Sequence, residues 1–422
     1  MIDLLIEPCG QLLTLAGGNL SPRRLDGMSD LGLVAQGAVG WDSASGLIEY
    51  SGPSSGLDRK LLAGDCRIVD AAGCVVLPGF VDSHTHLVFA GSRADEFYRR
   101  SCGESYADIA RAGDGILSTM QATRQASEDE LYELALKRLR RLYANGTTAV
   151  EVKTGYGLSA EAETKCLRVI RRLRDSAPGL VLATYLGAHA VPPEYAGHCA
   201  DYIHEVARQI AVLAHQGLAD FIDVFVDPLA FSLEDAERVT RAAGHVGLGI
   251  KLHADEFGDD GTAAWGVGQG ALSLDHLGGI GEAGIAALAA SNTVATLLPA
   301  TMFFSGHGKY APTRRMIDAG CAVALATDLN PGSSLVYSML LVMTFAVLEM
   351  QLSAEECIVA STINGAHALG LAAKAGSLEV GKRADVIIAD VPDYHELPYH
   401  VGCNLIRNVF IGGRRFGSTD IA

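Results

Sequence analysis

Two histidines separated by one residue, His84 and His86, have the spacing of metal ligands. They follow an apolar run, residues 75–82, that is typical of a β-strand. Successive side chains of a strand point to opposite faces, so residues two apart point the same way and both imidazoles can bind one cation. An isolated pair of this kind is as often two histidines at the edge of a core strand, so the assignment needs further support.

Three further strand-like runs provide that support, because each of them also ends in a residue that can bind a metal. These residues are His253 at the end of 248–253, His276 at the end of 272–276, and Asp328 at the end of 322–328. Imidazole and carboxylate groups are common ligands of divalent metal ions. The repeated arrangement predicts a metal centre at a place where several strands end.

The elements that must position these residues alternate regularly between residues 77 and 330. Short apolar, β-branched runs are separated by helical stretches, which is the pattern of a parallel sheet with crossover helices. The predicted strands are 76–82, 147–153, 180–187, 220–226, 248–253, 271–275, 294–298 and 321–327. Eight such units predict a closed (β/α)8 TIM-like barrel over residues 76–373, with its active site at the carboxyl ends of the strands.

The helices carry their own signals. Ser127 with Glu130 predicts a capping box, and the helix that follows is expected to end at Asn145 and Gly146. Its predicted apolar stripe is Leu131, Leu134, Ala135, Leu139 and Leu142. The basic residues at 137, 138, 140 and 141 are expected to form the solvated or snorkelling face of this helix. A second capping box is predicted at Ser353 and Glu356.

The two ends of the chain differ from its middle. Residues 1–75 and 374–422 contain short strand candidates, among them 38–41, 66–69, 384–389 and 408–411, joined by glycine and proline. Short strands are not stable unpaired in water. We therefore expect head and tail to fold together as a composite β-sandwich beside the barrel.

The composition excludes some classes of partner. The chain has 49 acidic and 33 basic residues and a formal charge of -16. A surface this acidic disfavours nucleic acid and anionic membranes. A small anionic substrate is still compatible with the composition, because one arginine in a cleft can hold a carboxylate.

The cysteines and the apolar segments bear on location. Nine cysteines lie without any C-x-x-C spacing, which favours reduced thiols in the cytoplasm. The first residues carry acids and lack the apolar core of a secretory signal. The longest apolar stretch, 335–348, is shorter than the ~18 residues of a membrane span and predicts a buried helix.

The strand-end residues resemble the metal scaffold of the amidohydrolase superfamily, and the tail segment 376–387 resembles the return of that superfamily from its barrel to its sandwich. Within the superfamily, longer blocks around the predicted barrel mouth resemble the imidazolonepropionase family. These blocks are 84–93, 151–158, 186–192, 251–257 and 327–334.

The resemblance implies a reaction and a set of site residues. The reaction is hydrolysis of the cyclic amide C–N bond of 4-imidazolone-5-propanoate to N-formimidoyl-L-glutamate, in histidine degradation. The implied metal ligands are His84, His86, His253 and Asp328. The residues implied to contact substrate or product are Arg93, Tyr156, His189, Glu256, Asn330, Gly332 and Ser333. Superfamily members of this type are often homodimers, which we expect here, with 335–348 contributing to the interface.

We expect one divalent ion per subunit, zinc or iron, since histidine and carboxylate ligands suit both. Many superfamily members hold two metals with a lysine on strand four, but the predicted fourth strand, 221–227, contains none. Lys153, at the end of strand two, is interpreted as structural. Glu256 lies three residues after His253 and is the leading acid/base candidate, with Asp328 able to share that role.

Several roles have alternatives. His276 is either a fourth histidine ligand or a free donor to the reacting carbonyl, and we favour the donor. Arg93 either holds the substrate carboxylate or forms an ion pair with Asp95 or Glu96. A ring deaminase would use the same metal centre, but a neutral base has no carboxylate for Arg93 to hold. A barrel that has lost catalysis would have lost ligands, and all are present.

Overall fold

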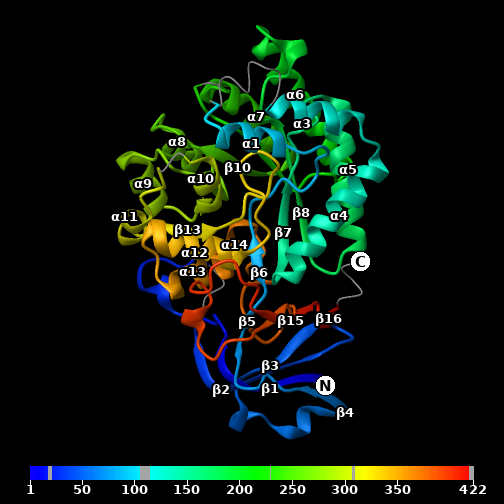
Figure 1. Cartoon of the computed structure of the whole chain (residues 1–422), viewed down its shortest axis with the longest axis vertical. Helices are drawn as coiled ribbons and strands as arrows, with labels where there is room; N and C mark the ends of the chain where they lie inside the picture. Colours follow the sequence, from blue (N-terminus) through cyan, green and yellow to red (C-terminus); the bar gives the residue numbers. More distant parts are fainter. Residues whose placement is uncertain (18–20, 105–114, 229, 307–308, 418–422) are drawn as a thin grey trace.

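The computed structural model describes residues 1–17, 21–104, 115–228, 230–306 and 309–417. Figure 1 shows two parts: a barrel of strands surrounded by helices, and a separate sheet that combines strands from both ends of the chain. The barrel carries the residues predicted to do chemistry.

Eight parallel strands form the barrel, each hydrogen-bonded to the next in chain order. They are β6 (Phe80–Asp82), β7 (Thr147–Lys153), β8 (Leu180–Ala188), β9 (Phe221–Val224), β10 (Gly249–Ala254), β11 (Ser273–His276), β12 (Val294–Leu297) and β13 (Ala322–Leu325). Their residues are buried almost throughout, because helices cover the outside and side chains fill the inside. The predicted (β/α)8 barrel is confirmed.

The barrel closes just beyond the ends of its first and last strands. The backbone N–H of His86 donates to the carbonyl of Leu329 at 2.9 Å, and that of Asp328 donates to the carbonyl of His84 at 3.0 Å. Closure therefore places the two histidines that follow β6 directly beside the aspartate that follows β13.

The predicted strand 76–82 is wrong as one element, because it is divided between the two parts of the molecule. Its first half, β5 (Val75–Pro78), pairs with β1 and β14 of the separate sheet, and only β6 belongs to the barrel. Gly79 joins them where a Cβ atom would lie 2.2 Å from Thr148 Oγ1, so no other residue fits without a shift. The proposed division into 1–75 with 374–422 and 76–373 stays a prediction.

The described helices lie around the barrel and at its ends (Figure 1). They are α1 (Ala94–Ser101), α3 (Ile116–Gln125), α4 (Glu128–Ala144), α5 (Ala160–Ser176), α6 (Cys199–His215), α7 (Leu233–Val246), α8 (Thr262–Gly268), α9 (Glu282–Ala289), α10 (Pro299–Ser305), α11 (Thr313–Asp318), α12 (Met339–Met350), α13 (Ala354–Ala360) and α14 (Ile363–Ala368). Both predicted capping boxes are present, at the starts of α4 and α13.

Two expectations for α4 are wrong. Leu134, expected in the apolar stripe, is 38% exposed. Arg138, expected on the solvated face, is buried: its Nη1 donates to the carbonyls of Leu87 and Phe89, each at 2.8 Å, and its guanidinium lies over the Phe89 ring. Burial is tolerated because the loop after β6 offers carbonyl oxygens that need donors.

Head and tail form one continuous sheet with a core of its own. Its strands are β1 (Ile2–Leu13), β2 (Leu33–Asp42), β3 (Leu47–Pro53), β4 (Leu62–Val69), β5, β14 (Val386–Ala389), β15 (Ile406–Ile411) and β16 (Arg414–Phe416). Successive residues of these strands point to opposite faces of the sheet. Val76 and Ile388 pack in the sheet's own hydrophobic cluster, whereas Leu77 and Ile387 pack in the main core of the molecule. The sheet is therefore attached to the barrel by the apolar side chains of one face.

The apolar stretch 335–348 corresponds largely to α12. Most residues of α12 are buried, as predicted, but Leu348 is 67% exposed. Among the described residues, no helix combines the length and the apolar character that crossing a membrane requires.

Candidate active site

The strand ends bring five of the predicted residues together in the interior of the barrel mouth. His84 and His86 follow β6, His253 lies near the end of β10, His276 ends β11, and Asp328 follows β13. All five side chains are buried. One nitrogen or oxygen of each of His84, His253 and His276 lies within 4.8 Å of the others, and the same holds for His84, His86 and Asp328.

The two groups of possible ligands lie next to each other. Asp328 Oδ1 lies 3.5 Å from His84 Nε2 and 3.6 Å from His86 Nε2. The ring of His84 is 4.7 Å from that of His253, and the ring of His253 is 5.0 Å from that of His276. Because His84 belongs to both groups, all five residues border one small volume.

The residues present fit a divalent metal ion. Carboxylates lie against the Nδ1 atoms of two histidines: His84 Nδ1 is 2.7 Å from Asp275 Oδ2, which is a hydrogen bond, and His253 Nδ1 is 2.9 Å from Asp223 Oδ2, which is an ion-pair distance without hydrogen-bond geometry. Such carboxylates fix a tautomer whose Nε2 lone pair is available to a metal. His84 Nε2 is buried without a hydrogen-bond partner among the described residues, an arrangement that a cation would satisfy.

Burial and charge set the protonation of the histidines. Burial, with neighbouring cationic groups, holds the pKa of His84 and of His86 well below the ordinary value, so both are neutral and able to bind a metal. Burial also lowers the pKa of His253, but its contact with Asp223 outweighs that effect and raises the pKa above its ordinary value. A cation and a proton therefore compete for His253.

Two carboxyl groups at the centre have raised pKa values. Burial raises the pKa of Glu256 to about 8, and its Oε1 lies 3.4 Å from His276 Nδ1. Burial also raises the pKa of Asp328 to about 6, although a hydrogen bond from Thr301 opposes the shift. A carboxyl group with a pKa near 8 carries a proton at neutral pH and can deliver it to a leaving group.

The backbone is strained at the same place. His276 and Asp328 have φ values of 76° and 49°, in the left-handed region that residues with a side chain rarely adopt. Strain of this kind persists only where the surrounding structure imposes it, and it concentrates at functional sites.

Arg93 lies beside the loop that contains Asn330, Gly332 and Ser333. Its Nε donates to Glu96 at 2.8 Å, so the ion pair considered from the sequence is present. A Cβ atom on Gly332 would lie 2.1 Å from Arg93 Nη1, which shows how closely the loop approaches the guanidinium. Asn330 Oδ1 shapes this loop by accepting the backbone N–H groups of Gly332 and Ser333, each at 2.8 Å.

Tyr156 and His189 lie against the histidine cluster beside His86. The ring of His189 stacks on His86 at 5.3 Å and is 5.5 Å from the ring of Tyr156. His189 Nδ1 is 3.0 Å from the Gly155 carbonyl. Both rings therefore border the histidine cluster from the loops after β7 and β8.

Sequence reasoning singled out Lys153 as structural but missed the group of buried charges to which it belongs. Glu151, Lys153, Asp223, Lys251 and Asp275 are all buried in barrel strands and paired with one another. The available signal was a charged residue inside an otherwise apolar strand, as at Asp223 and Asp275. A charge in such a strand is buried, so it requires a partner of opposite sign.

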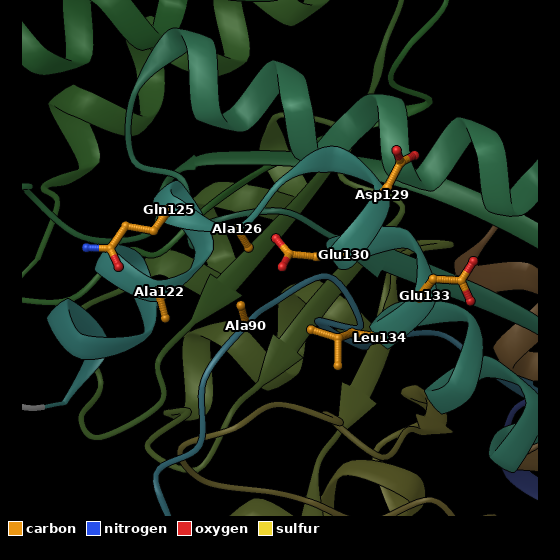
Figure 2. Close-up of a pocket in the computed structure, with 8 residues that line it drawn as sticks. All are labelled: Ala90, Ala122, Gln125, Ala126, Asp129, Glu130, Glu133 and Leu134. Carbon is orange, nitrogen blue, oxygen red and sulfur yellow. The ribbon is translucent and has the colours of Figure 1, made fainter.

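A groove elsewhere on the barrel is a poor substrate site. It has a volume of about 740 Å³ and lies between α3 and α4 (Figure 2). It is lined by Ala90, Ala122, Gln125, Ala126, Asp129, Glu130, Glu133 and Leu134. Its three acidic residues repel an anion, and no predicted site residue is among those that line it.

Comparison with known proteins agrees with the fold. The model of the amidohydrolase family matches residues 75–416. Two solved structures share the fold: an adenosine deaminase from Xanthomonas campestris with bound zinc (TM-score 0.70, 18% identity, 98% of this chain and 92% of that chain) and Escherichia coli guanine deaminase (TM-score 0.73, 16% identity, 98% of each). The chain therefore belongs to the amidohydrolase family.

Curated relatives narrow the assignment. The chain is 45% identical to an imidazolonepropionase of Symbiobacterium thermophilum, over 98% of this chain and 97% of the relative. It is 44% identical to that of Parabacteroides distasonis and 43% identical to that of Geobacillus kaustophilus, in each case over 98% of both proteins. Within the amidohydrolases, the chain is a member of the imidazolonepropionase family.

Proposed function

We propose that this protein hydrolyses the cyclic amide C–N bond of 4-imidazolone-5-propanoate to give N-formimidoyl-L-glutamate, in histidine degradation. The full-length similarity to imidazolonepropionases is the observation that carries the proposal. The buried cluster of histidines and an aspartate at the barrel mouth supports it, because hydrolysis of an unactivated amide needs an activated water.

The proposed metal ligands are His84, His86, His253 and Asp328, which would hold one divalent ion, zinc or iron. Their convergence and the carboxylates behind His84 and His253 support this set. When bound, such an ion supplies Lewis-acid chemistry: it lowers the pKa of water from about 15.7 to about 7 and polarises a carbonyl oxygen.

Arg93 is the proposed anchor for the propionate. Its planar guanidinium can donate two parallel hydrogen bonds to a carboxylate. Glu96 holds its Nε, which leaves the two terminal nitrogens to face other groups. Gly332 and Ser333, in the loop shaped by Asn330, would contact the same end of the substrate, and Tyr156 with His189 would contact the imidazolone ring.

The proton transfers that the reaction requires suggest roles for Glu256, Asp328 and His276. Hydrolysis adds a hydroxyl to the ring carbonyl carbon, breaks its bond to nitrogen, and places a proton on that nitrogen. Glu256 is protonated at neutral pH because burial raises its pKa, so we assign it the transfer to nitrogen, with Asp328 able to accept the proton of water. His276 would donate to the oxygen that becomes an anion.

The test is a direct assay. Metal-replete protein is mixed with freshly made 4-imidazolone-5-propanoate and the loss of its ultraviolet absorbance is followed, with His253→Ala as the control. We expect rapid loss with the wild type and none with the variant. If metal-loaded wild type causes no loss of absorbance but releases ammonia from guanine or adenosine, the proposal is wrong and the protein is a ring deaminase.

We also propose a homodimer in the cytoplasm. Phe303 of α10 is 59% exposed and stacks on Phe345 of α12 at 4.4 Å, close to exposed Leu348 along the same helix. Exposed apolar groups that lie together favour contact with a second copy. Light scattering that gives the mass of a monomer at micromolar concentration would exclude the dimer.

A further inference from the structure

Lys153, the last residue of β7, lies fully buried among three carboxylates. Its Nζ is 2.8 Å from Asp223 Oδ2, 2.9 Å from Glu151 Oε1 and 3.2 Å from Asp275 Oδ2. Burial alone would lower its pKa, but these three carboxylates raise the pKa above the ordinary value, so the ammonium stays charged. A buried charge in this position requires such pairing.

Two of the oxygens that Lys153 contacts also contact proposed metal ligands. Asp275 Oδ2 is 2.7 Å from His84 Nδ1, and Asp223 Oδ2 is 2.9 Å from His253 Nδ1. One ammonium therefore connects two carboxylate–histidine pairs that come from four different strands or strand ends.

Apart from Lys153 and the two histidines, each aspartate accepts a hydrogen bond from a neutral group. The second oxygen of Asp223 accepts the backbone N–H of His253 at 3.0 Å, and the second oxygen of Asp275 accepts the hydroxyl of Ser273 at 2.7 Å. Neither contact supplies positive charge. Lys153 is thus the cation in direct contact with both aspartates among the described residues.

We propose that Lys153 is a positioning residue of the proposed metal centre: it holds Asp223 and Asp275 in place against Nδ1 of His253 and of His84, so that the Nε2 atoms of both histidines face a divalent cation. This role goes beyond the structural interpretation of Lys153 from the sequence.

The physical consequence of removing Lys153 follows from charge. Two buried carboxylates would lose the cation that holds them side by side, and each could turn away from its histidine. A histidine whose Nδ1 no longer faces a carboxylate is less well fixed in ring orientation and tautomer, so its Nε2 is less well placed for a metal. Metal binding is therefore weakened.

Lys251 provides a matched control. It is also fully buried, carries the same charge and pairs with the same Glu151, but its other contact is the Ser83 carbonyl at 2.8 Å. Asp223 and Asp275 are not within ion-pair distance of it among the described residues. Loss of Lys251 removes a buried charge of the same kind without removing the bridge.

The experiment measures zinc affinity of the full-length protein by competition with a chromophoric chelator, for Lys153→Met, Lys251→Met and Lys153→Arg, with circular dichroism and Tm of each apoprotein. We expect Lys153→Met to bind zinc at least about tenfold more weakly, Lys251→Met to stay within about threefold of wild type, and Lys153→Arg to recover most of the affinity. The visible spectrum of the cobalt-substituted protein should change in Lys153→Met alone.

Wild-type zinc affinity and cobalt spectrum in Lys153→Met would overturn the proposal, and so would equal losses in Lys153→Met and Lys251→Met. If Lys153→Met does not fold, the double variant Lys153→Met with Glu151→Gln replaces it, because it removes one charge of each sign. Weak zinc binding by that folded variant supports the proposal, and wild-type affinity refutes it.

Discussion

At the scale of single residues, the side chains of the proposed site are positioned by contacts with neighbouring charged residues. Arg93 is oriented by Glu96, whose other oxygen accepts the backbone N–H of Gly115 at 2.9 Å. Asp275 and Asp223 lie against Nδ1 of His84 and of His253, two of the proposed metal ligands. The proposed site residues are therefore positioned by residues that have no proposed contact with substrate.

A substitution at Gly332 tests whether the loop that contains Asn330, Gly332 and Ser333 must approach Arg93 closely. In Gly332→Ala the new Cβ atom meets Arg93 Nη1, so the guanidinium must move away from the carboxylate that it is proposed to bind. Loss of a hydrogen bond to a charged group costs about 1.5–3 kcal/mol, which corresponds to a rise in KM of roughly 10–100-fold, with kcat much less affected.

Steady-state kinetics on the imidazolone substrate measure this effect. Gly244→Ala is the control, because a Cβ at this position of α7 has open space around it. An unchanged KM in Gly332→Ala would remove Arg93 from substrate binding.

At the scale of elements, helix α4 reaches into the loop that follows β6. Arg138 satisfies two carbonyls of that loop, at Leu87 and Phe89, a few residues before Arg93. The helix thus supports the segment that carries both the first two proposed metal ligands and the proposed anchor of the substrate.

Arg138→Met is expected to lower the free energy of unfolding by about 2–4 kcal/mol. Methionine keeps much of the packing but leaves two buried carbonyls without donors, and each costs about 1–3 kcal/mol. Lys137→Met, one residue away and exposed, should change the stability by less than about 0.5 kcal/mol. Urea denaturation of both variants measures the difference, and equal stabilities would contradict the role given to Arg138.

At the scale of the whole molecule, the two ends of the chain place positive charge near helix α14. Burial lowers the pKa of His367, on α14, to about 4, and the positive charges of Lys382 and Arg23 add to that shift. These two basic residues come from the tail and the head of the chain, so His367 reports on how the ends are packed.

This shift predicts a dependence of stability on pH. The folded pKa is below the unfolded value of about 6.5, so the unfolded chain binds the proton first and stability is lost as pH falls from about 6.5 to about 4. The loss of Tm over that range should be smaller in His367→Gln than in wild type. His204→Gln, exposed on α6, is the control, and an identical pH profile for His367→Gln and wild type would refute the assignment.

Much of the architecture follows from local patterns. The alternation of apolar strands with capped helices predicts the barrel, because burial on both faces of a parallel strand leaves a local record in its composition. The same reasoning joined 75–78 to 80–82, because two adjoining buried strands look alike whichever sheet each belongs to. The burial of Arg138 could not be predicted from the sequence either, because its position in the helix does not show which segment packs against it.

The amino-acid order alone was sufficient for the fold, the family and the residues at the strand ends, since metal ligands of this type are recognised by residue type and by spacing. Which of these residues contact one another was decided only by the tertiary structure. Only closure of β6 against β13 brings His84 to Asp328, and only the packed interior brings Lys153 to Asp223 and Asp275. Contacts between distant strands depend on barrel geometry and leave no mark in the spacing of neighbouring residues.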